Sequence, residues 1–311
     1  MPNAKIIFMG TPDFAVPALH VLAKRNDIDL CLVVTQPDRP AGRGKKLLAP
    51  PVAQAAGELD LPLIQTDSLR HPEIRQQIID EQPDLVVVAA FGMILGKWIL
   101  DLPTHGCVNL HASLLPKYRG ASPISESILM GEPVTGVTLM QMDRGLDTGD
   151  MLATIEVPIQ SDDTTESLTP KLATAAAELL DARLVELLAG SLTPVPQPEG
   201  ATETRQLTKD DGRIDWNLPA IEIERQIRAM WSWPRAWSVL PDETRMQIHE
   251  ANVSASDSLT VGQLEVADGE VRIGTGDGVL EVVRAQLPGG KPIDGNALIQ
   301  KLTQKSGEIL S

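Results

Sequence analysis

Continuous apolar runs, separated by helix-like segments, fill the first two hundred residues and constrain the fold more than any other feature. The runs are Lys5–Gly10, Leu30–Gln36, Leu61–Thr66, Asp84–Phe91 and Gly106–His111. Because they do not alternate between apolar and polar residues, both faces of each strand are expected to be buried. The helix-like segments between them are Phe14–Arg25, Pro51–Leu59 and Pro72–Glu81. This order predicts an α/β fold with a Rossmann-like, mostly parallel sheet covered by helices on both faces.

Two more strands and a long helix complete this half of the chain. Thr135–Met142 and Met151–Ile159 are β-like, and they can pair antiparallel across the turn-rich segment Asp143–Asp150. A long helix is expected over Thr164–Ala189.

The pattern changes after residue 189. Gly190–Gln206 has the composition of a linker, with three prolines in a short polar stretch. Beyond a helix candidate at Pro219–Met230, short β-like runs recur between turn residues, which predicts a small antiparallel β-barrel. We therefore expect domains at 1–189 and 207–311, joined by a linker at 190–206. Four tryptophans near the start of the second domain suit either packing or stacking on nucleic acid: Trp216, Trp231, Trp233 and Trp237.

Cysteine content and hydropathy indicate a cytoplasmic protein. Cys31 and Cys107 are too few for a disulfide scaffold, and both lie within β-like runs. No apolar run approaches the roughly 20 residues that a membrane-spanning helix needs. The first residues lead directly into a strand and do not have the pattern of a secretion signal.

Charge excludes a protein that coats nucleic acid in general, since the formal net charge of -15 repels phosphate over most of the surface. It leaves room for a nucleic-acid substrate held by one basic patch. Such a patch lies in a glycine- and proline-punctuated loop, with the residues Arg39, Arg43, Lys45 and Lys46. Without further information, these four residues are also compatible with a solvated turn.

Asn109 and His111 are the leading candidates for chemistry. The period of two along a strand places both on one face, at the carboxyl end, where open parallel sheets hold their ligands. The loop Asp143–Asp150 contains two glycines and can bring Asp147 to His111.

An amide donor, an imidazole and a carboxylate together suit acyl transfer to an amine without a covalent enzyme intermediate. Asn109 can donate to a developing oxyanion, and His111 can do so when protonated beside a carboxylate. Asp147 can orient the imidazole, hold its charge and accept the amine's proton.

Other classes of site find less support. No Gly-x-Ser-x-Gly elbow is present, and Cys107 is in mid-strand, so a serine or thiol nucleophile is unsupported. A metal site from His105, Cys107 and His111 has no further ligands at suitable spacing. Gly10 stands alone after the first strand, so the dinucleotide-binding glycine pattern is absent there. That absence argues against a nicotinamide dehydrogenase.

Two segments carry a family resemblance. Val108–Ala121 (VNLHASLLPKYRGA) and Leu146–Asp150 (LDTGD) resemble the two signatures of folate-dependent formyltransferases. The resemblance implies 10-formyltetrahydrofolate as formyl donor, no metal, no nicotinamide, and catalytic roles for Asn109, His111 and Asp147. It also implies folate contacts, which fall on Ser113, Leu114, Leu115, Pro116, Phe91, Ile94, Leu95 and Asp143.

Two further stretches, Ile7–Phe14 and Thr35–Leu47, are similar to the branch of this family that formylates methionyl-tRNA. In that branch the basic loop wedges the tRNA acceptor end, and Arg43 matches its key arginine. The branch also carries a C-terminal barrel like an oligonucleotide-binding fold, which helps to hold the tRNA. The chain departs from the pattern at Glu203–Gln206 and at Thr169-Pro170, and its residues from Leu207 onward include more acids than bases.

The resemblance therefore implies a monomeric cytoplasmic enzyme that formylates the amino group of initiator methionyl-tRNA for translation initiation. Alternatives keep the folate and change the acceptor to an amino-sugar nucleotide, glycinamide ribonucleotide or water. A non-catalytic RNA-binding protein is a further alternative, against which the Asn, His and Asp set argues.

Overall fold

The computed structural model describes residues 3–41, 46–254 and 259–310. The chain divides into two compact units that interleave along the sequence. The first comprises Met1–Pro123, Val134–Pro158 and Thr169–Thr204, and the second comprises Ile124–Pro133, Ile159–Leu168 and Arg205–Ser311. The division into domains at 1–189 and 207–311, joined by a linker at 190–206, stays a prediction.

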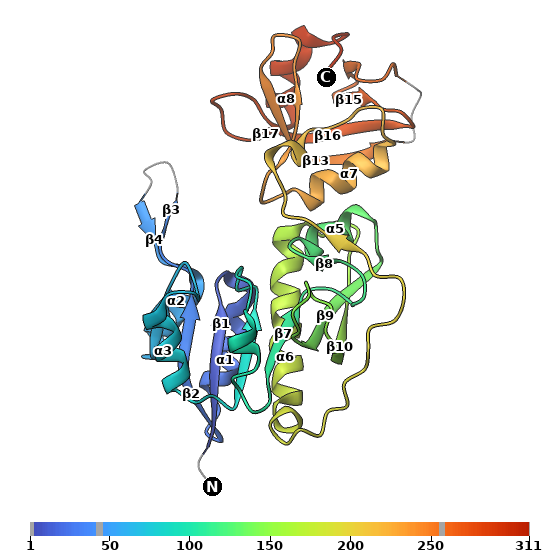
Figure 1. Ribbon diagram of the computed structural model, residues 1–311. Helices are drawn as coiled ribbons and strands as arrows, with labels where there is room; N and C mark the ends of the chain where they lie inside the picture. The colour runs from blue at the N-terminus through green and yellow to red at the C-terminus, as the bar shows by residue number, and fades with distance from the viewer. Residues whose placement is uncertain (1–2, 42–45, 255–258, 311) are drawn as a thin grey trace. The chain divides into compact units, whose positions relative to one another are not determined.

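The first unit is built on a seven-stranded sheet with the order β10-β9-β7-β6-β1-β2-β5 (Figure 1). Five strands run parallel: β1 (Ala4–Gly10), β2 (Ile28–Thr35), β5 (Leu63–Gln65), β6 (Leu85–Ala89) and β7 (Cys107–His111). The strands β9 (Val134–Gln141) and β10 (Met151–Pro158) extend it as an antiparallel pair. The expected mostly parallel sheet is confirmed, as is the pairing across the turn-rich segment.

The order of the strands defines where a ligand is expected. From β1 the chain proceeds outward to β2 and β5, and then returns to the other side of β1 to form β6 and β7. The reversal lies between β1 and β6, and open α/β sheets bind ligands beyond the carboxyl ends of such strands.

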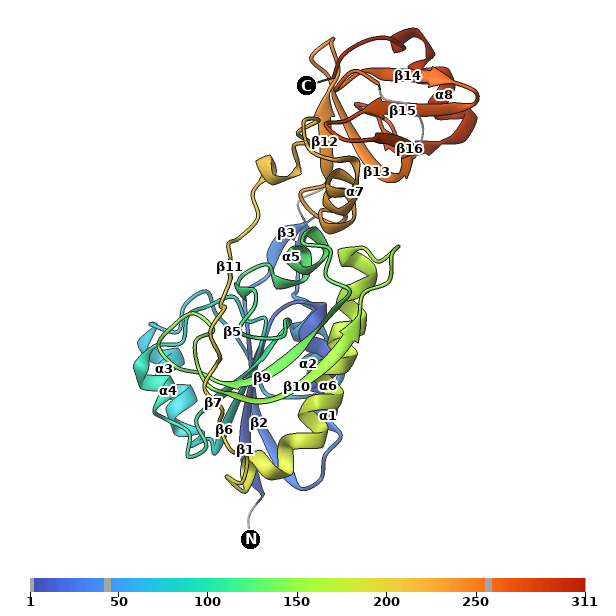
Figure 2. The same ribbon diagram turned by 90° about the vertical axis from the view of Figure 1, so that its right-hand side faces the viewer.

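Helices cover both faces of this sheet. Figure 2 shows α3 (Pro72–Asp80) and α4 (Lys97–Leu100) on one side, with α1 (Val16–Ala23), α2 (Pro51–Glu58) and α6 (Thr165–Leu188) on the other. Ile78 of α3 and Ile99 of α4 pack with Ile7, Val86 and Val88 of the strands in one buried cluster. Continuous apolar strands are therefore buried on both faces, as their composition predicts.

The sequence pattern did not predict several short elements. The basic stretch forms an antiparallel hairpin, β3 (Arg39–Ala41) and β4 (Lys46–Leu48), where a plain loop was expected. Three others are β8 (Arg119–Gly120), α5 (Pro123–Leu129) and the 3-10 helix η1 (Asp13–Ala15). Residues 42–45, which include Arg43 and Lys45, lie outside the described residues.

The segment 190–206, called the linker segment below, is hydrogen-bonded to the first unit along much of its length. Val195 and Met151 exchange two backbone hydrogen bonds of 2.9 and 2.8 Å. Farther along, β11 (Glu203–Thr204) pairs in parallel with β8. These backbone pairings hold the linker segment against the sheet of the first unit.

The second unit contains an antiparallel sheet with the order β12-β13-β16-β15-β14, and β17 pairs with β16. The strands are β12 (Ala236–Val239), β13 (Arg245–Ser254), β14 (Leu264–Ala267), β15 (Glu270–Gly274), β16 (Val279–Gln286) and β17 (Ile293–Asp294). The helices after residue 205 in the described part of this unit are η2 (Lys209–Gly212), α7 (Ala220–Ala229), α8 (Gly295–Leu302) and η3 (Thr303–Lys305), and most of α5 belongs to the unit as well. The expected antiparallel C-terminal β domain is confirmed.

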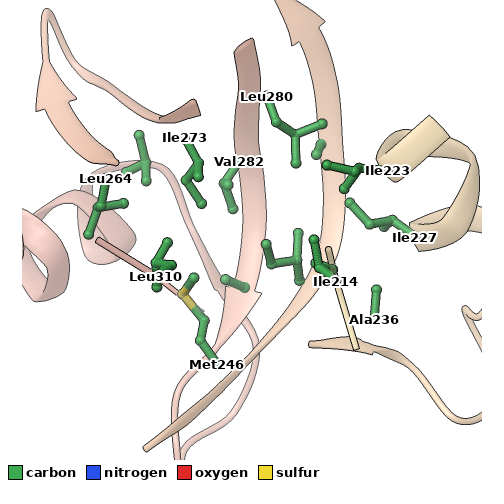
Figure 3. Close-up of a cluster of buried hydrophobic side chains, with 14 of the residues drawn as sticks. Ile214, Ile223, Ile227, Ala236, Met246, Leu264, Ile273, Leu280, Val282 and Leu310 are labelled. Atoms are coloured by element: carbon green, nitrogen blue, oxygen red, sulfur yellow. The ribbon is translucent and has the colours of Figure 1, made fainter. Parts of the chain in front are cut away.

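One apolar core holds the second unit together (Figure 3). Ile223 and Ile227 from α7 meet Met246, Ile273 and Leu280 from the sheet, and each of these side chains is buried. The glycine-rich stretch 274–278 ends β15 and leads into the antiparallel β16 as a hairpin turn.

The tryptophan cluster divides between packing and exposure. Trp216 is buried and donates a 2.9 Å hydrogen bond from Nε1 to Ser238 Oγ, and Trp237 is buried beneath the Arg245 guanidinium, 3.6 Å from the ring centroid. Trp233 is 50% exposed. Packing therefore accounts for Trp216 and Trp237, and Trp233 presents an indole surface to solvent.

In the parts of the chain that the structure describes, no helix combines the length and apolarity needed to cross a bilayer.

Candidate active site

Asn109 and His111 lie in the interior strand β7, of which His111 is the last residue. Their side chains are nearly buried, with 9% and 5% exposure, at the carboxyl edge of the sheet. The strand lies between β6 and β9: Asn109 is paired on both sides, with Val88 and Met140, whereas His111 is paired with Thr138 of β9.

The segment Asp143–Asp150, called the Asp147 loop below, brings Asp147 to this edge. Asp147 Oδ2 lies 3.6 Å from His111 Nδ1, and Asp147 Oδ1 lies 3.4 Å from Asn109 Nδ2. The backbone N–H of Gly120 donates a 2.8 Å hydrogen bond to Asp147 Oδ2. The three residues expected to carry the chemistry are therefore brought together.

The contacts of His111 define what each ring nitrogen can do. Nε2 lies 2.9 Å from the backbone oxygen of Tyr118, and a carbonyl oxygen only accepts, so Nε2 carries a proton and donates. Nδ1 is then the nitrogen that faces Asp147, at a separation too long for a direct hydrogen bond. Nδ1 can act as a donor toward the edge of the sheet only in the form of the ring that carries a proton on this nitrogen.

Most of the stretch Ser113–Pro116 is internal. The Ser113 side chain is fully buried and donates to the backbone oxygen of Lys117 at 2.6 Å. Leu115 is also buried, and its N–H donates to Thr138 Oγ1 at 3.1 Å. Only Leu114 and Pro116 are partly exposed, so any direct side-chain contact with a ligand from this stretch falls to them.

The predicted folate-binding segment Phe91–Leu95 follows β6 at the strand reversal. Phe91 and Leu95 are buried, whereas Ile94 is 90% exposed. The Phe91 carbonyl accepts hydrogen bonds from Thr11 Oγ1 at 3.0 Å and Gln36 Nε2 at 2.9 Å. Thr11 and Gln36 were not singled out as site residues, although both lie in stretches that carry the family resemblance.

Asp143 shapes the Asp147 loop from within. Its carboxylate accepts from the Gly145 N–H at 2.9 Å and from Thr148 Oγ1 at 2.7 Å. Both bonds are local, as in the turns that short acidic side chains commonly form. A folate contact at Asp143 stays a prediction.

Gln197 of the linker segment also reaches the Asp147 loop. Its Nε2 donates to the backbone oxygens of Asp147 at 2.7 Å and Gly149 at 2.8 Å. Sequence reasoning missed this residue because linker composition gives no signal for a contact with a loop some fifty positions away.

The basic hairpin contributes Arg39, whose guanidinium donates to Gln36 Oε1. Gln36 therefore connects the start of the hairpin to the Phe91 carbonyl. Lys46 opens β4, and the exposed Leu47 and Leu48 follow it. The structure leaves the predicted tRNA contacts of Arg43 and Lys45 outside the described residues.

Cys107 is buried in β7, and burial raises the pKa of its thiol to about 12. Its Sγ lies 3.3 Å from the backbone oxygen of Ile99, which it faces as a donor. A protonated thiol in this position does not serve as a nucleophile. Among the described residues, no group of three or more His, Cys, Asp and Glu side chains is arranged to hold a metal ion.

Comparison with known proteins places this geometry in a family. A formyl transferase family model matches residues 4–184, and one for the formyl transferase C-terminal domain matches residues 206–303. A methionyl-tRNA formyltransferase of Marinobacter nauticus is 45% identical over 299 residues, covering 95% of each chain. One from Halorhodospira halophila is 46% identical over 291 residues, covering 93% of each.

Solved structures share the fold at low identity. An N-formyltransferase from Helicobacter canadensis, solved in complex with folinic acid and dTDP-3-aminofucose, superposes with a TM-score of 0.68 at 20% identity, covering 91% of this chain and 99% of that one. A sugar N-formyltransferase from a Shewanella species gives a TM-score of 0.62 at 18% identity, covering 83% and 99%. On the matches to both family models and to relatives over nearly their whole length, the chain belongs to the formyl transferase family.

Proposed function

We propose that this protein transfers a formyl group from 10-formyltetrahydrofolate to the amino group of initiator methionyl-tRNA, giving N-formylmethionyl-tRNA. The observation that carries the proposal is the convergence of Asn109, His111 and Asp147 at the carboxyl end of β7. Relatives named methionyl-tRNA formyltransferase, at 41–46% identity, support the choice of acceptor. Because charged tRNA is used in translation, the proposed place of action is the cytoplasm. The proposed working form is a monomer.

Asn109 is proposed to stabilise the oxyanion that develops when the amine attacks the formyl carbon. Its amide is nearly buried, and removing one such donor typically costs about 10²–10³ in rate. His111 Nδ1, when protonated, donates to the same developing charge. Its orientation is set beforehand by the Nε2–H bond to Tyr118, so little reorganisation accompanies the reaction.

Asp147 is proposed to stabilise the imidazolium and to take the proton that the amine loses as the new C–N bond forms. Oδ2 is engaged by Gly120, whereas Oδ1 has only the long 3.4 Å contact to Asn109. We therefore assign the proton to Oδ1, directly or through a water molecule. Asp147 then returns this proton, directly or through the same water molecule, to the folate nitrogen as the bond between that nitrogen and the formyl carbon breaks.

The residues around the site fit a flat, partly apolar donor. Ile94, Leu114 and Pro116 present apolar surface from two segments that meet the carboxyl edge of the sheet. Gly92 has a φ of +76°, and a Cβ there would lie 2.5 Å from Gln36 Nε2. The apolar surface of Ile94, Leu114 and Pro116 is proposed to bind the pterin ring, beside the Phe91 carbonyl.

The acceptor is proposed to bind through the β3–β4 hairpin and the second unit. Arg39, Arg43, Lys45 and Lys46 lie in 8 consecutive positions of a chain with a formal net charge of -15, so they form a local exception to its acidity. Phosphate contacts of this kind position a nucleic acid without reading its bases.

The test is formyl transfer from 10-formyltetrahydrofolate to methionine-charged initiator tRNA, measured against charged elongator tRNA and against water. The proposal expects N-formylmethionine on the initiator tRNA and little product from the other two acceptors. Folate turnover without a formylated tRNA would instead point to another amine, such as an amino-sugar nucleotide, or to hydrolysis.

A further inference from the structure

Gln197 lies in the linker segment, outside every residue set assigned above to the reaction. It is partly buried, between the Asp147 loop and the strand β8. Both the NH2 group and the oxygen of its amide are engaged by other residues of the first unit.

The contacts of Gln197 reach both the backbone of the Asp147 loop and Arg119, the neighbour of Gly120. Its Nε2 donates to the backbone oxygens of Asp147 and Gly149, at 2.7 and 2.8 Å. Its Oε1 accepts from Arg119 Nε and Nη2, at 3.0 and 2.8 Å. Arg119 precedes Gly120, whose N–H holds the Asp147 carboxylate. The Gln197 side chain therefore links the Asp147 backbone to the strand β8, whose Gly120 N–H binds the Asp147 carboxylate.

Asp147 needs such support. Its φ of +51° lies in the left-handed region, which non-glycine residues adopt only when the surroundings hold them there. Its side-chain distances to His111 and Asn109, 3.6 and 3.4 Å, are long. Its neighbours Leu146 and Thr148 are exposed, so packing around the loop is sparse.

The linker segment is itself firmly placed on either side of Gln197. Two residues earlier, Val195 pairs with Met151, and later the N–H of Tyr118 donates to Thr202 Oγ1 at 2.8 Å. A side chain on a fixed backbone can hold a loop, whereas the same side chain on a free linker would follow it.

We propose that Gln197 is a positioning residue for the formyl transfer: its two N–H groups hold the Asp147 backbone so that the carboxylate meets His111 and Asn109. This inference rests on the proposed function for its kinetic readout, and on the loop geometry alone for a second readout.

The kinetic test compares Gln197→Glu and Gln197→Ala with wild type in methionyl-tRNA formylation. Gln197→Glu keeps the size and the acceptor for Arg119 but loses both N–H donors. The loss of two hydrogen bonds that orient a catalytic carboxylate is expected to lower kcat by roughly ten- to thirtyfold in both variants. The KM for tRNA and for folate is expected to stay within about twofold. Full kcat in Gln197→Glu would overturn the proposal, because the donors would then be dispensable.

A matched control and a double variant separate positioning from general damage. Glu199→Ala changes an exposed residue of the same segment and is expected to leave kcat unchanged. If Gln197 acts through Asp147, adding Gln197→Ala to Asp147→Ala costs less than about threefold, because interacting residues are not additive. A full additional tenfold loss in the double variant would show that Gln197 acts elsewhere.

The second readout does not depend on the acceptor. Backbone hydrogen exchange over residues 143–150 is expected to speed up at least severalfold in Gln197→Glu and to remain at the wild-type rate in Glu199→Ala. Unchanged exchange in Gln197→Glu would contradict the inference even if the protein proved to formylate a different amine. Absence of tRNA formylation in wild type would instead contradict the proposed function alone.

Discussion

The position of Asp147 depends on groups that come from other elements of the fold. Its carboxylate takes its position from a backbone N–H at Gly120, and its backbone is held by an amide from the linker segment. Neither partner shares an element with Asp147, and neither lies within twenty residues of it in sequence.

At the residue scale, Gly120 can be tested directly. Its φ is +107°, and a Cβ there would lie 2.2 Å from the backbone oxygen of Thr204. Gly120→Ala is expected to destabilise the protein by about 1–3 kcal/mol and to lower activity, because the N–H that holds Asp147 must move. Thermal unfolding and formylation rates measure both effects.

Gly57 provides the matched control for that substitution. It lies within α2, with nothing within 4 Å of an added Cβ. Gly57→Ala is expected to stabilise by about 0.5–1 kcal/mol, as alanine is a better helix former. Equal effects of the two substitutions would contradict the account of Gly120.

Cys107 lies two residues before Asn109 and supports a further prediction. Because burial raises the pKa of its thiol to about 12, modification by a thiol reagent at pH 8 is expected to be slow in the folded protein. Denaturation is expected to expose both Cys107 and Cys31 to rapid labelling. Fast labelling of Cys107 in the active enzyme, with loss of activity, would revive the thiol as a catalytic group.

The identities of Asn109 and His111 were accessible from sequence because a strand's period of two and its carboxyl end are local properties. Asp147 was accessible from the two-glycine loop that can fold back over the sheet end, and the motif resemblance supported the same residue. The Tyr118 carbonyl, the Gly120 N–H and Gln197 were not accessible, because backbone groups have no residue-type signature and Gln197 meets the loop only through tertiary folding.

At the scale of elements, long strands and helices follow the sequence pattern closely. The expected strand Asp84–Phe91 is β6 at Leu85–Ala89, and the expected helix Pro72–Glu81 is α3 at Pro72–Asp80. The strand β6 is buried along its whole length, and α3 turns Ile78 toward the core while most of its other residues are partly or fully exposed, so apolar pattern specifies both elements. The two-residue strands β8 and β11 form only because they meet each other, which no local pattern reports.

His249 on β13 provides a test of stability in the second unit. Burial lowers the pKa of its imidazole, and the nearby Arg235 guanidinium lowers it further. Since the folded-state pKa is below the ordinary value of about 6.5, the unfolded chain binds more protons between the two values. The contribution of neutral His249 is therefore present above about pH 6.5 and is lost as the pH falls through the folded-state pKa.

The measurement is the free energy of unfolding of the full chain against pH, for wild type and His249→Gln. Wild type is expected to lose more stability than the variant as the pH falls below about 6.5. The comparison cancels the carboxylates common to both proteins, Asp211 and Asp242 included, whose lowered pKa values act in more acidic solution. Parallel curves would show that His249 does not titrate differently on folding.

At the scale of the whole molecule, the formal net charge of -15 contrasts with the proposed polyanionic acceptor. Recognition must then depend on a few cations in favourable places, and the sequence stretch 39–46 supplies four: Arg39, Arg43, Lys45 and Lys46. The rest of the surface opposes nonspecific binding of nucleic acid.

Salt dependence tests that view. Arg39→Ala is expected to weaken tRNA binding and to reduce the slope of log affinity against log salt by roughly one. Arg183→Ala in α6 removes an exposed cation that pairs with Glu186, and it is expected to change neither quantity. An unchanged slope in Arg39→Ala would remove that residue from the tRNA contacts.

The central claim is that Asn109, His111 and Asp147 perform the formyl transfer, whereas other residues of the protein bind the tRNA. The most direct test measures single-turnover formylation of initiator methionyl-tRNA and tRNA affinity on the same preparations of Asn109→Ala, His111→Ala and Asp147→Ala. Each variant is expected to lose at least about 10² in rate while its tRNA affinity stays within about threefold of wild type. Near-normal transfer in all three variants would contradict the account.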